Sequence, residues 1–158
     1  MSEADEQAEL HRQFTGWRSR EMECGSMRVL LFGGTGMVGQ GVLRECLLDP
    51  EVELVQTIGR SATGKQHARL KEIVHQDLFH YEAMESELAG YDACFFCLGV
   101  SSAGMSEEDY FHLTFELTIT AAATLARLNP QMTFLYISGA GTDTSEHGRS
   151  MWARVKGK

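Results

Sequence analysis

A cluster of glycines follows a short apolar segment near residue 30, and this arrangement could bind an anion. Residues 29–32 are apolar and predict a buried strand, after which Gly33, Gly36 and Gly39 recur at every third position, followed by apolar residues at helical spacing. A strand, a glycine turn and a helix N-terminus together present backbone N–H groups and a partial positive charge to a phosphate. The spacing is G-x-x-G-x-x-G rather than the usual G-x-G-x-x-G, and tight packing alone also favours glycine. We predict that this turn binds the pyrophosphate of a dinucleotide.

A single arginine at the end of the second expected strand suggests which dinucleotide is bound. NAD-binding domains usually have an acid at this place, whereas the chain has Gly59 and Arg60. An arginine can pair bidentately with the 2′-phosphate of NADP. We therefore predict NADP(H) in preference to NAD(H), the alternative being that Arg60 is a solvated loop residue.

Strands and helices alternate along the rest of the chain. Strands are predicted at 29–32, 52–58, 70–75, 91–98 and 133–137, and helices from residue 37, at 81–88 and at 106–128. Ser106 and Asp109 form a capping-box pattern at the start of the longest helix. Such alternation predicts an α/β fold with a doubly wound parallel sheet in the order 3-2-1-4-5. Ligands bind beyond the carboxyl ends of such strands, where the glycine turn and Arg60 are expected.

Composition and charge restrict the class of protein. The chain has 158 residues, 43% of them hydrophobic, and a formal net charge of −8, which suits one globular domain. The negative charge disfavours nucleic acid and anionic membrane surfaces as partners. No apolar run approaches the ~20 residues that span a bilayer, and no signal-peptide pattern is present. A cytoplasmic protein is expected.

The cysteines and histidines do not form a recognisable redox or metal motif. Cys94 and Cys97 have C-x-x-C spacing but fall in an expected strand, where their side chains would point to opposite faces. We interpret them as core residues rather than as a redox pair, and the six scattered histidines predict no zinc site.

The first 26 residues differ from the remainder of the chain. They are rich in charge, and Leu10, Phe14 and Trp17 have the spacing of a short amphipathic helix that Gly16 would weaken. The favoured interpretation of residues 1–26 is a mobile tail, which leaves residues 27–158 as the dinucleotide-binding domain.

The motifs as a set resemble the extended and atypical short-chain dehydrogenase/reductases. Residues 35–41, TGMVGQG, match the T-G-x-x-G-x-G motif of that superfamily, and the segments TIGR, HQDL, FFCLG and YISGAG follow in the order it shows. The stretch 27–158 is most similar to the branch that contains Tat-interacting-protein-type oxidoreductases and bacterial nucleoside-diphosphate-sugar-epimerase-like proteins.

The resemblance implies a role for individual residues. Pyrophosphate binding would involve Gly33, Thr35, Gly36, Met37, Val38 and Gly39. Arg60 would meet the adenosine phosphate, Asp77 and Leu78 the adenine, and Leu98 and Gly99 the nicotinamide ribose. Ser138 matches the serine that polarises the substrate, although a strand-end turn also explains a serine here. Lys156 matches the lysine of Y-x-x-x-K, which binds the nicotinamide ribose.

The chain departs from the family pattern at the catalytic tyrosine, whose position is occupied by Trp152. An indole N–H can donate a hydrogen bond but cannot deliver a proton. The chain also ends two residues after Lys156, so we expect a domain truncated in its fifth helix, with residues 141–158 poorly packed.

Three functions remain open at this point. The first is an NADP-dependent oxidoreductase or epimerase acting on an unknown small molecule. The second is a non-catalytic dinucleotide-binding sensor or regulator, which Trp152 favours. The third is a site for another phosphate ligand, such as FMN or a nucleotide sugar. A homodimer through the long helix from Ser106 is a further expectation.

Overall fold

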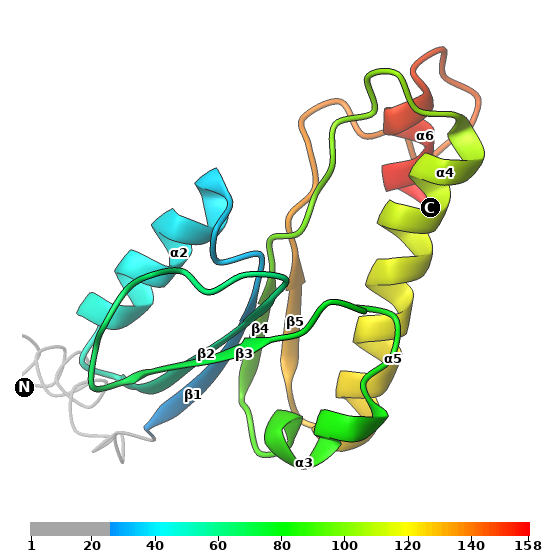
Figure 1. Cartoon of the computed structure of the whole chain (residues 1–158). Helices are drawn as coiled ribbons and strands as arrows, with labels where there is room; N and C mark the ends of the chain where they lie inside the picture. Colours follow the sequence, from blue (N-terminus) through cyan, green and yellow to red (C-terminus); the bar gives the residue numbers. More distant parts are fainter. Residues whose placement is uncertain (1–25) are drawn as a thin grey trace, which may run out of the picture.

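The computed structural model describes residues 26–158 and contains one parallel sheet of five strands (Figure 1). The strands lie in the order β3-β2-β1-β4-β5, and every neighbouring pair is parallel. Their bounds are β1 Met27–Phe32, β2 Val52–Gly59, β3 Leu70–Val74, β4 Ala93–Phe96 and β5 Thr133–Tyr136. The predicted fold class and strand order are confirmed, although β4 is shorter at both ends than the sequence pattern indicated.

Helices cover the two faces of the sheet (Figure 1). Helix α2 (Met37–Leu48) packs on one face, and the helices that follow β3 and β4 pack on the other. These are the short η1 (Glu82–Met84) and α3 (Glu85–Leu88), and then α4 (Glu107–Phe111), the π-helical η2 (His112–Glu116) and α5 (Leu117–Leu128). Residues 60–69 connect β2 to β3 without a helix. No helix in residues 26–158 is long and apolar enough to cross a lipid bilayer.

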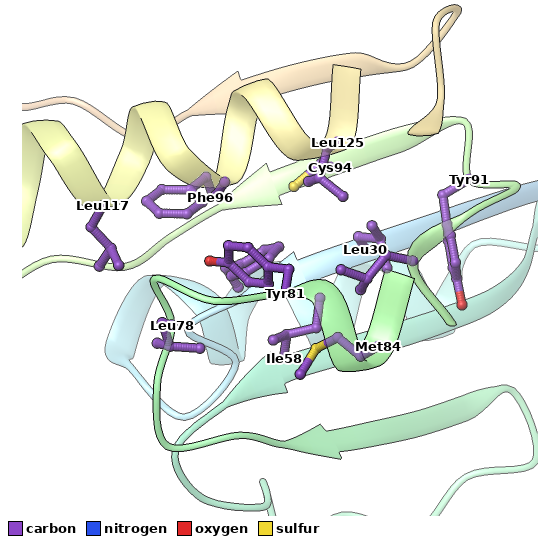
Figure 2. Packing of buried hydrophobic residues seen from close by; sticks show 13 residues of the cluster. Leu30, Ile58, Leu78, Tyr81, Met84, Tyr91, Cys94, Phe96, Leu117 and Leu125 are labelled. Carbon is purple, nitrogen blue, oxygen red and sulfur yellow. The ribbon is translucent and has the colours of Figure 1, made fainter. Parts of the chain in front are cut away.

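The central strand β1 is apolar from residue 29 to residue 32 because both of its faces are buried there. Leu30 and Phe32 point into a core formed with α3 and α5, while Val29 and Leu31 point into a second core under α2. All four side chains have 0% exposure, so this part of the sequence shows no alternation of apolar and polar residues. Figure 2 shows the first core, in which Tyr81 lies among Ile58, Phe96 and other apolar side chains.

The two cysteines of the C-x-x-C sequence belong to different cores, as predicted. Cys94 is buried in the core with α5, and Cys97 packs against the core under α2. Burial raises the pKa of both thiols, which opposes the thiolate that redox chemistry requires.

Polar side chains fix the ends of three helices. The buried Asn129, after α5, accepts hydrogen bonds from the backbone of Gly90 and Tyr91 at 2.6 and 3.0 Å. Its amide donates to the carbonyls of Leu88 and Leu125 at 2.9 and 3.3 Å, which joins the ends of α3 and α5. At the start of α4, Ser106 accepts from the Asp109 backbone at 3.0 Å, which confirms the predicted cap.

The C-terminal helix α6 (Met151–Gly157) packs against the domain, and this corrects the expectation of poor packing for that part of residues 141–158. Ala153 and Val155 are 4% and 1% exposed, beside α4 and η2. Arg154 pairs with Glu107 of α4 at 2.6 Å. Even a helix of two turns is therefore held by tertiary contacts. The prediction of a tail or short helix in the N-terminal region falls on residues 1–25, which lie outside the described residues.

Candidate functional site

The glycine turn between β1 and α2 is closed by contacts that leave no room for side chains at two positions. Gly33 has a φ of +76°, and a Cβ there would lie 2.9 Å from the carbonyl oxygen of Cys97. A Cβ on Gly39 would lie 2.0 Å from the carbonyl oxygen of Gly33. The first turn of α2 thus rests directly on the backbone of the turn, and this close approach requires glycine.

The N-terminus of α2 is open to an anion. Gly36 is the N-cap, and within the described residues no side chain caps the helix and its first turn contains no acid. The first backbone N–H groups of a helix have no intrahelical partner, and the helix dipole makes them attractive to phosphate. Met37 is 89% and Val38 44% exposed, so the first residues of the helix lie at the surface. Gln40 donates to the carbonyl of Thr35 at 2.8 Å and steadies the turn.

A cavity of about 370 Å³ lies at the carboxyl ends of β2, β3 and β4. Its lining includes Arg60 after β2, Asp77 and Leu78 after β3, and Leu98 and Gly99 after β4. The remaining lining residues are Gln76, Phe79, Val100, Leu113 and Leu117. The cavity is mostly apolar, with polar groups confined to the strand ends, which suits a flat ring flanked by hydroxyls and phosphate.

The segment after β3 is held in one conformation by hydrogen bonds around Asp77. The Asp77 carboxylate accepts from the Phe79 backbone at 3.0 Å and from His80 Nδ1 at 2.8 Å. The hydrogen bond from the Phe79 N–H, and to a smaller extent the one from His80, lowers the pKa of Asp77. The hydrogen bond between Asp77 and His80 also raises the pKa of His80. The Phe79 ring stacks on His112 of η2 with centroids 4.4 Å apart, so this edge of the cavity is also tied to the long helix.

Ser138 follows β5, and its hydroxyl forms a short chain with two neighbours. Its Oγ lies 2.7 Å from Thr142 Oγ1, which lies 2.7 Å from the carbonyl oxygen of Gly139. A carbonyl can only accept, so Thr142 donates to Gly139 and Ser138 donates to Thr142. The lone pairs of Ser138 Oγ therefore remain available to a ligand. In this conformation Ser138 can only accept a hydrogen bond from a ligand, because its own hydrogen points to Thr142. Donating to a substrate carbonyl requires that hydrogen to turn away from Thr142.

Trp152 and Lys156 lie one turn apart on α6 and pack along the end of β5. The Trp152 ring lies so close to Gly139 that a Cβ there would be 3.3 Å from it. The Lys156 ammonium lies 5.5 Å from the centre of the Tyr136 ring. Burial lowers the pKa of Lys156, and it forms no ion pair with any residue in 26–158. The two side chains are thus brought to the region of Ser138.

The residues that form the glycine turn and the sheet also match the model of a known protein family. The model of the NAD-dependent epimerase/dehydratase family matches residues 29–147. The chain belongs to this family. No curated protein matches the chain.

Solved structures that resemble the chain have the fold of this family. Uronate dehydrogenase from Agrobacterium tumefaciens superposes with a TM-score of 0.64 at 20% identity, over 82% of this chain and 52% of that one. The Bordetella bronchiseptica enzyme WbmG in complex with NAD gives 0.65 at 15% identity, over 87% and 49%. A short-chain dehydrogenase/reductase superfamily protein from A. tumefaciens with bound NAD gives 0.61 at 18%, over 82% and 42%. The chain spans about half the length of these proteins.

The structure brings together part of the set of residues singled out in the sequence, whereas Ser138, Trp152 and Lys156 do not line the cavity at the strand ends, and Lys156 lines a separate one beside Tyr136. Five of the set, Arg60, Asp77, Leu78, Leu98 and Gly99, line the cavity at the strand ends. Gly33 adjoins it through Leu98, whose backbone nitrogen would lie 3.1 Å from a Cβ on Gly33. Sequence reasoning missed Leu113 and Leu117, because their helical spacing is equally typical of core residues. It also missed Thr142, because nothing in sequence distinguishes it from other loop hydroxyls.

Proposed function

We propose that the chain is the cofactor-binding part of an NADP(H)-dependent oxidoreductase or epimerase. The observation that carries this proposal is the cavity lined by Arg60, Asp77, Leu78, Leu98 and Gly99 beside the open N-terminus of α2. Family membership and the NAD complexes of two similar structures support the cofactor class. When bound, the dinucleotide supplies hydride transfer.

The residues present fit a dinucleotide. Gly33, Thr35, Gly36, Met37, Val38 and Gly39 would hold the pyrophosphate at the turn, where a Cβ on Gly33 or Gly39 would clash with backbone. Asp77 and Leu78 would border the adenine, and Leu98 and Gly99 the nicotinamide ribose. The uncapped helix end supplies the positive potential that the two phosphates require.

Arg60 supports NADP(H) over NAD(H). Its side chain is exposed at the cavity and forms no ion pair with a described residue. A ligand would therefore not have to break an ion pair in order to bind it. Gln76 donates to the Arg60 carbonyl at 2.8 Å and fixes its backbone. A guanidinium in this place can bind a 2′-phosphate, and the place lacks the acid that would bind a ribose hydroxyl.

Ser138 and Lys156 are proposed as the groups that hold the reacting oxygen and the nicotinamide ribose. Because Ser138 already donates to Thr142, it would accept a hydrogen bond from a substrate hydroxyl, which suits oxidation of an alcohol. Trp152 can donate a hydrogen bond at this place but cannot move a proton.

A second candidate function is a dinucleotide sensor or regulator without catalysis, and Trp152 favours it. The two functions share the binding site and differ only in turnover. With a uronate as the probe substrate, NADP reduction that Ser138→Ala abolishes would support the enzyme. Tight cofactor binding without turnover would support the sensor.

Cofactor titration tests the binding proposal that both functions share. The intact chain is titrated with NADPH and with NADH, with tryptophan fluorescence as the signal. We expect NADPH to bind at least tenfold more tightly, equivalent to about 1.4 kcal/mol. Arg60→Ala should remove most of this difference, whereas Arg149→Ala, in an exposed loop, should not. Failure of both cofactors to bind would refute the proposal.

A further inference from the structure

The loop that connects β2 to β3 is basic, and its first residue, Arg60, lines the cavity. Residues 60–69 contain Arg60, Lys65 and Arg69 and no acid, in a chain with 14 basic and 22 acidic residues. The Arg69 guanidinium is already used, because it donates to the carbonyls of Leu47, Asp49 and Val52. Neither Arg60 nor Lys65 forms an ion pair with any part of the chain that the structure describes. These two cations are available to an anionic ligand.

A glutamate on the edge strand anchors this loop. Glu72 of β3 lies beside Thr57 of β2 in the parallel register. Its Oε1 accepts from the Thr63 backbone at 2.7 Å, from the Thr63 hydroxyl, and from the Thr57 hydroxyl at 3.5 Å. Every one of these donors uses the same oxygen, and Glu72 has no described cationic partner. The carboxylate therefore serves as an acceptor for the loop.

The anchored threonine also packs against the glycine turn. A Cβ on Gly34 would lie 3.3 Å from Thr63 Cγ2 and 3.1 Å from Thr57 Cγ2. The Lys65 backbone donates to the Thr63 hydroxyl at 3.3 Å, so the same hydroxyl also fixes the chain beyond it. Thr63 lies between Arg60 and Lys65, and its contacts join their loop to the turn at the start of α2.

We propose that Thr63 and Glu72 are positioning residues that hold loop 60–69 against the glycine turn and thereby set the preference for a 2′-phosphorylated dinucleotide. This inference rests on the proposed NADP(H) function. An anchored loop holds Arg60 at the cavity before the ligand arrives, so the entropy of ordering it is not lost on binding. NADH lacks the 2′-phosphate that Arg60 would bind, so its affinity does not depend on the anchor.

The test compares NADPH and NADH titrations of the intact chain across matched variants. Glu72→Ala removes the acceptor, while Glu72→Gln keeps Oε1 and removes only the charge. Thr63→Val keeps the shape and the backbone N–H but removes the hydroxyl. Glu51→Ala is the charge control, because Glu51 is exposed at the opposite end of β2 and its side chain is not part of the site. Thermal unfolding of each variant is measured in parallel.

We expect Glu72→Ala to weaken NADPH about five- to tenfold, which is the scale of one ordinary hydrogen bond, and to leave NADH within about twofold. Thr63→Val should lower NADPH affinity in the same direction but less, and Glu72→Gln and Glu51→Ala should bind as the wild type does. Equal losses for the two cofactors, an unchanged Glu72→Ala, or a Glu72→Gln as weak as Glu72→Ala would overturn the inference. If Glu72→Ala does not fold, Thr63→Val decides the matter alone.

The outcomes separate this inference from the function beneath it. A wild-type chain that binds neither cofactor, or both equally, refutes the proposed NADP(H) preference and the anchor with it. A preference that Arg60→Ala abolishes but the anchor variants leave intact refutes the anchor only.

Discussion

Alanine substitutions at two glycines of helix α2 should change stability in opposite directions. Gly39 and Gly41 are two residues apart in the same helix, and only Gly39 faces the glycine turn. A Cβ at Gly39 would lie 2.0 Å from the Gly33 carbonyl oxygen, 2.7 Å from the Gly33 carbonyl carbon and 3.1 Å from Gly34 Cα. All three are backbone atoms, which cannot swing aside as a side chain can. A Cβ at Gly41 meets no described heavy atom within 4 Å.

The magnitudes follow from these contacts. Real Cβ atoms essentially never lie within 3.0 Å of another atom, so Gly39→Ala must push α2 away from the turn. Overpacking of this kind costs about 3 kcal/mol at the upper end of the usual range. The higher helix propensity of alanine offsets about 1 kcal/mol, which leaves a net loss of about 2 kcal/mol. Gly41→Ala keeps only the propensity term and should gain about 1 kcal/mol.

Urea denaturation followed by circular dichroism measures both changes, and NADPH titration adds a functional measurement. Gly39→Ala should also weaken NADPH binding, because moving α2 misplaces the N–H groups at its N-terminus, whereas Gly41→Ala should not. Equal stability changes for the two variants, or a stabilised Gly39→Ala with full NADPH affinity, would refute the close packing of helix on turn.

Three further predictions concern polar contacts elsewhere in the fold. Arg69→Ala should lower the free energy of unfolding by about 2 kcal/mol in urea denaturation, because three backbone carbonyls lose their donor. Asn129→Ala should lower the free energy of unfolding by about 3 kcal/mol in the same assay, because the backbone N–H groups of Gly90 and Tyr91 lose their acceptor. A loss under about 1 kcal/mol would contradict these contacts. Asp77→Asn should lower the pKa of His80 measured by NMR, because Asp77 raises it. The stability from this pair is present below the unfolded-state pKa of His80 and is lost as pH rises through the folded-state pKa, so the Asp77→Asn difference should shrink at alkaline pH.

The sheet and much of the site could be predicted from the sequence because local signals specify them. Residues 29–32 of strand β1 are apolar since both faces are buried there, and the glycines after them mark a turn that has no room for larger side chains at Gly33 and Gly39. Given a parallel doubly wound sheet, Arg60, Asp77 and Leu98 are expected at the same edge, since each follows the carboxyl end of a strand of that sheet.

Other features depend on tertiary contacts that leave no local signal. Glu72 has the sequence character of a solvated edge-strand residue, yet its carboxylate binds a loop nine residues earlier. The π-helical turn His112–Glu116 interrupts a segment whose sequence predicts continuous helix. The packing of α6 likewise depends on Glu107 and its neighbours, which are far away in the sequence. The length of the helix alone therefore gave the wrong expectation that it would be poorly packed.

The most direct test of the central claim is to map NADPH binding by amide chemical shifts on the isotopically labelled chain. The account predicts shifts at the glycine turn from Gly33 to Val38, at Arg60, at Asp77 and Leu78, and at Leu98 and Gly99. Shifts confined to the α5 and α6 surface, or absent from the glycine turn when NADPH is in excess, would contradict it.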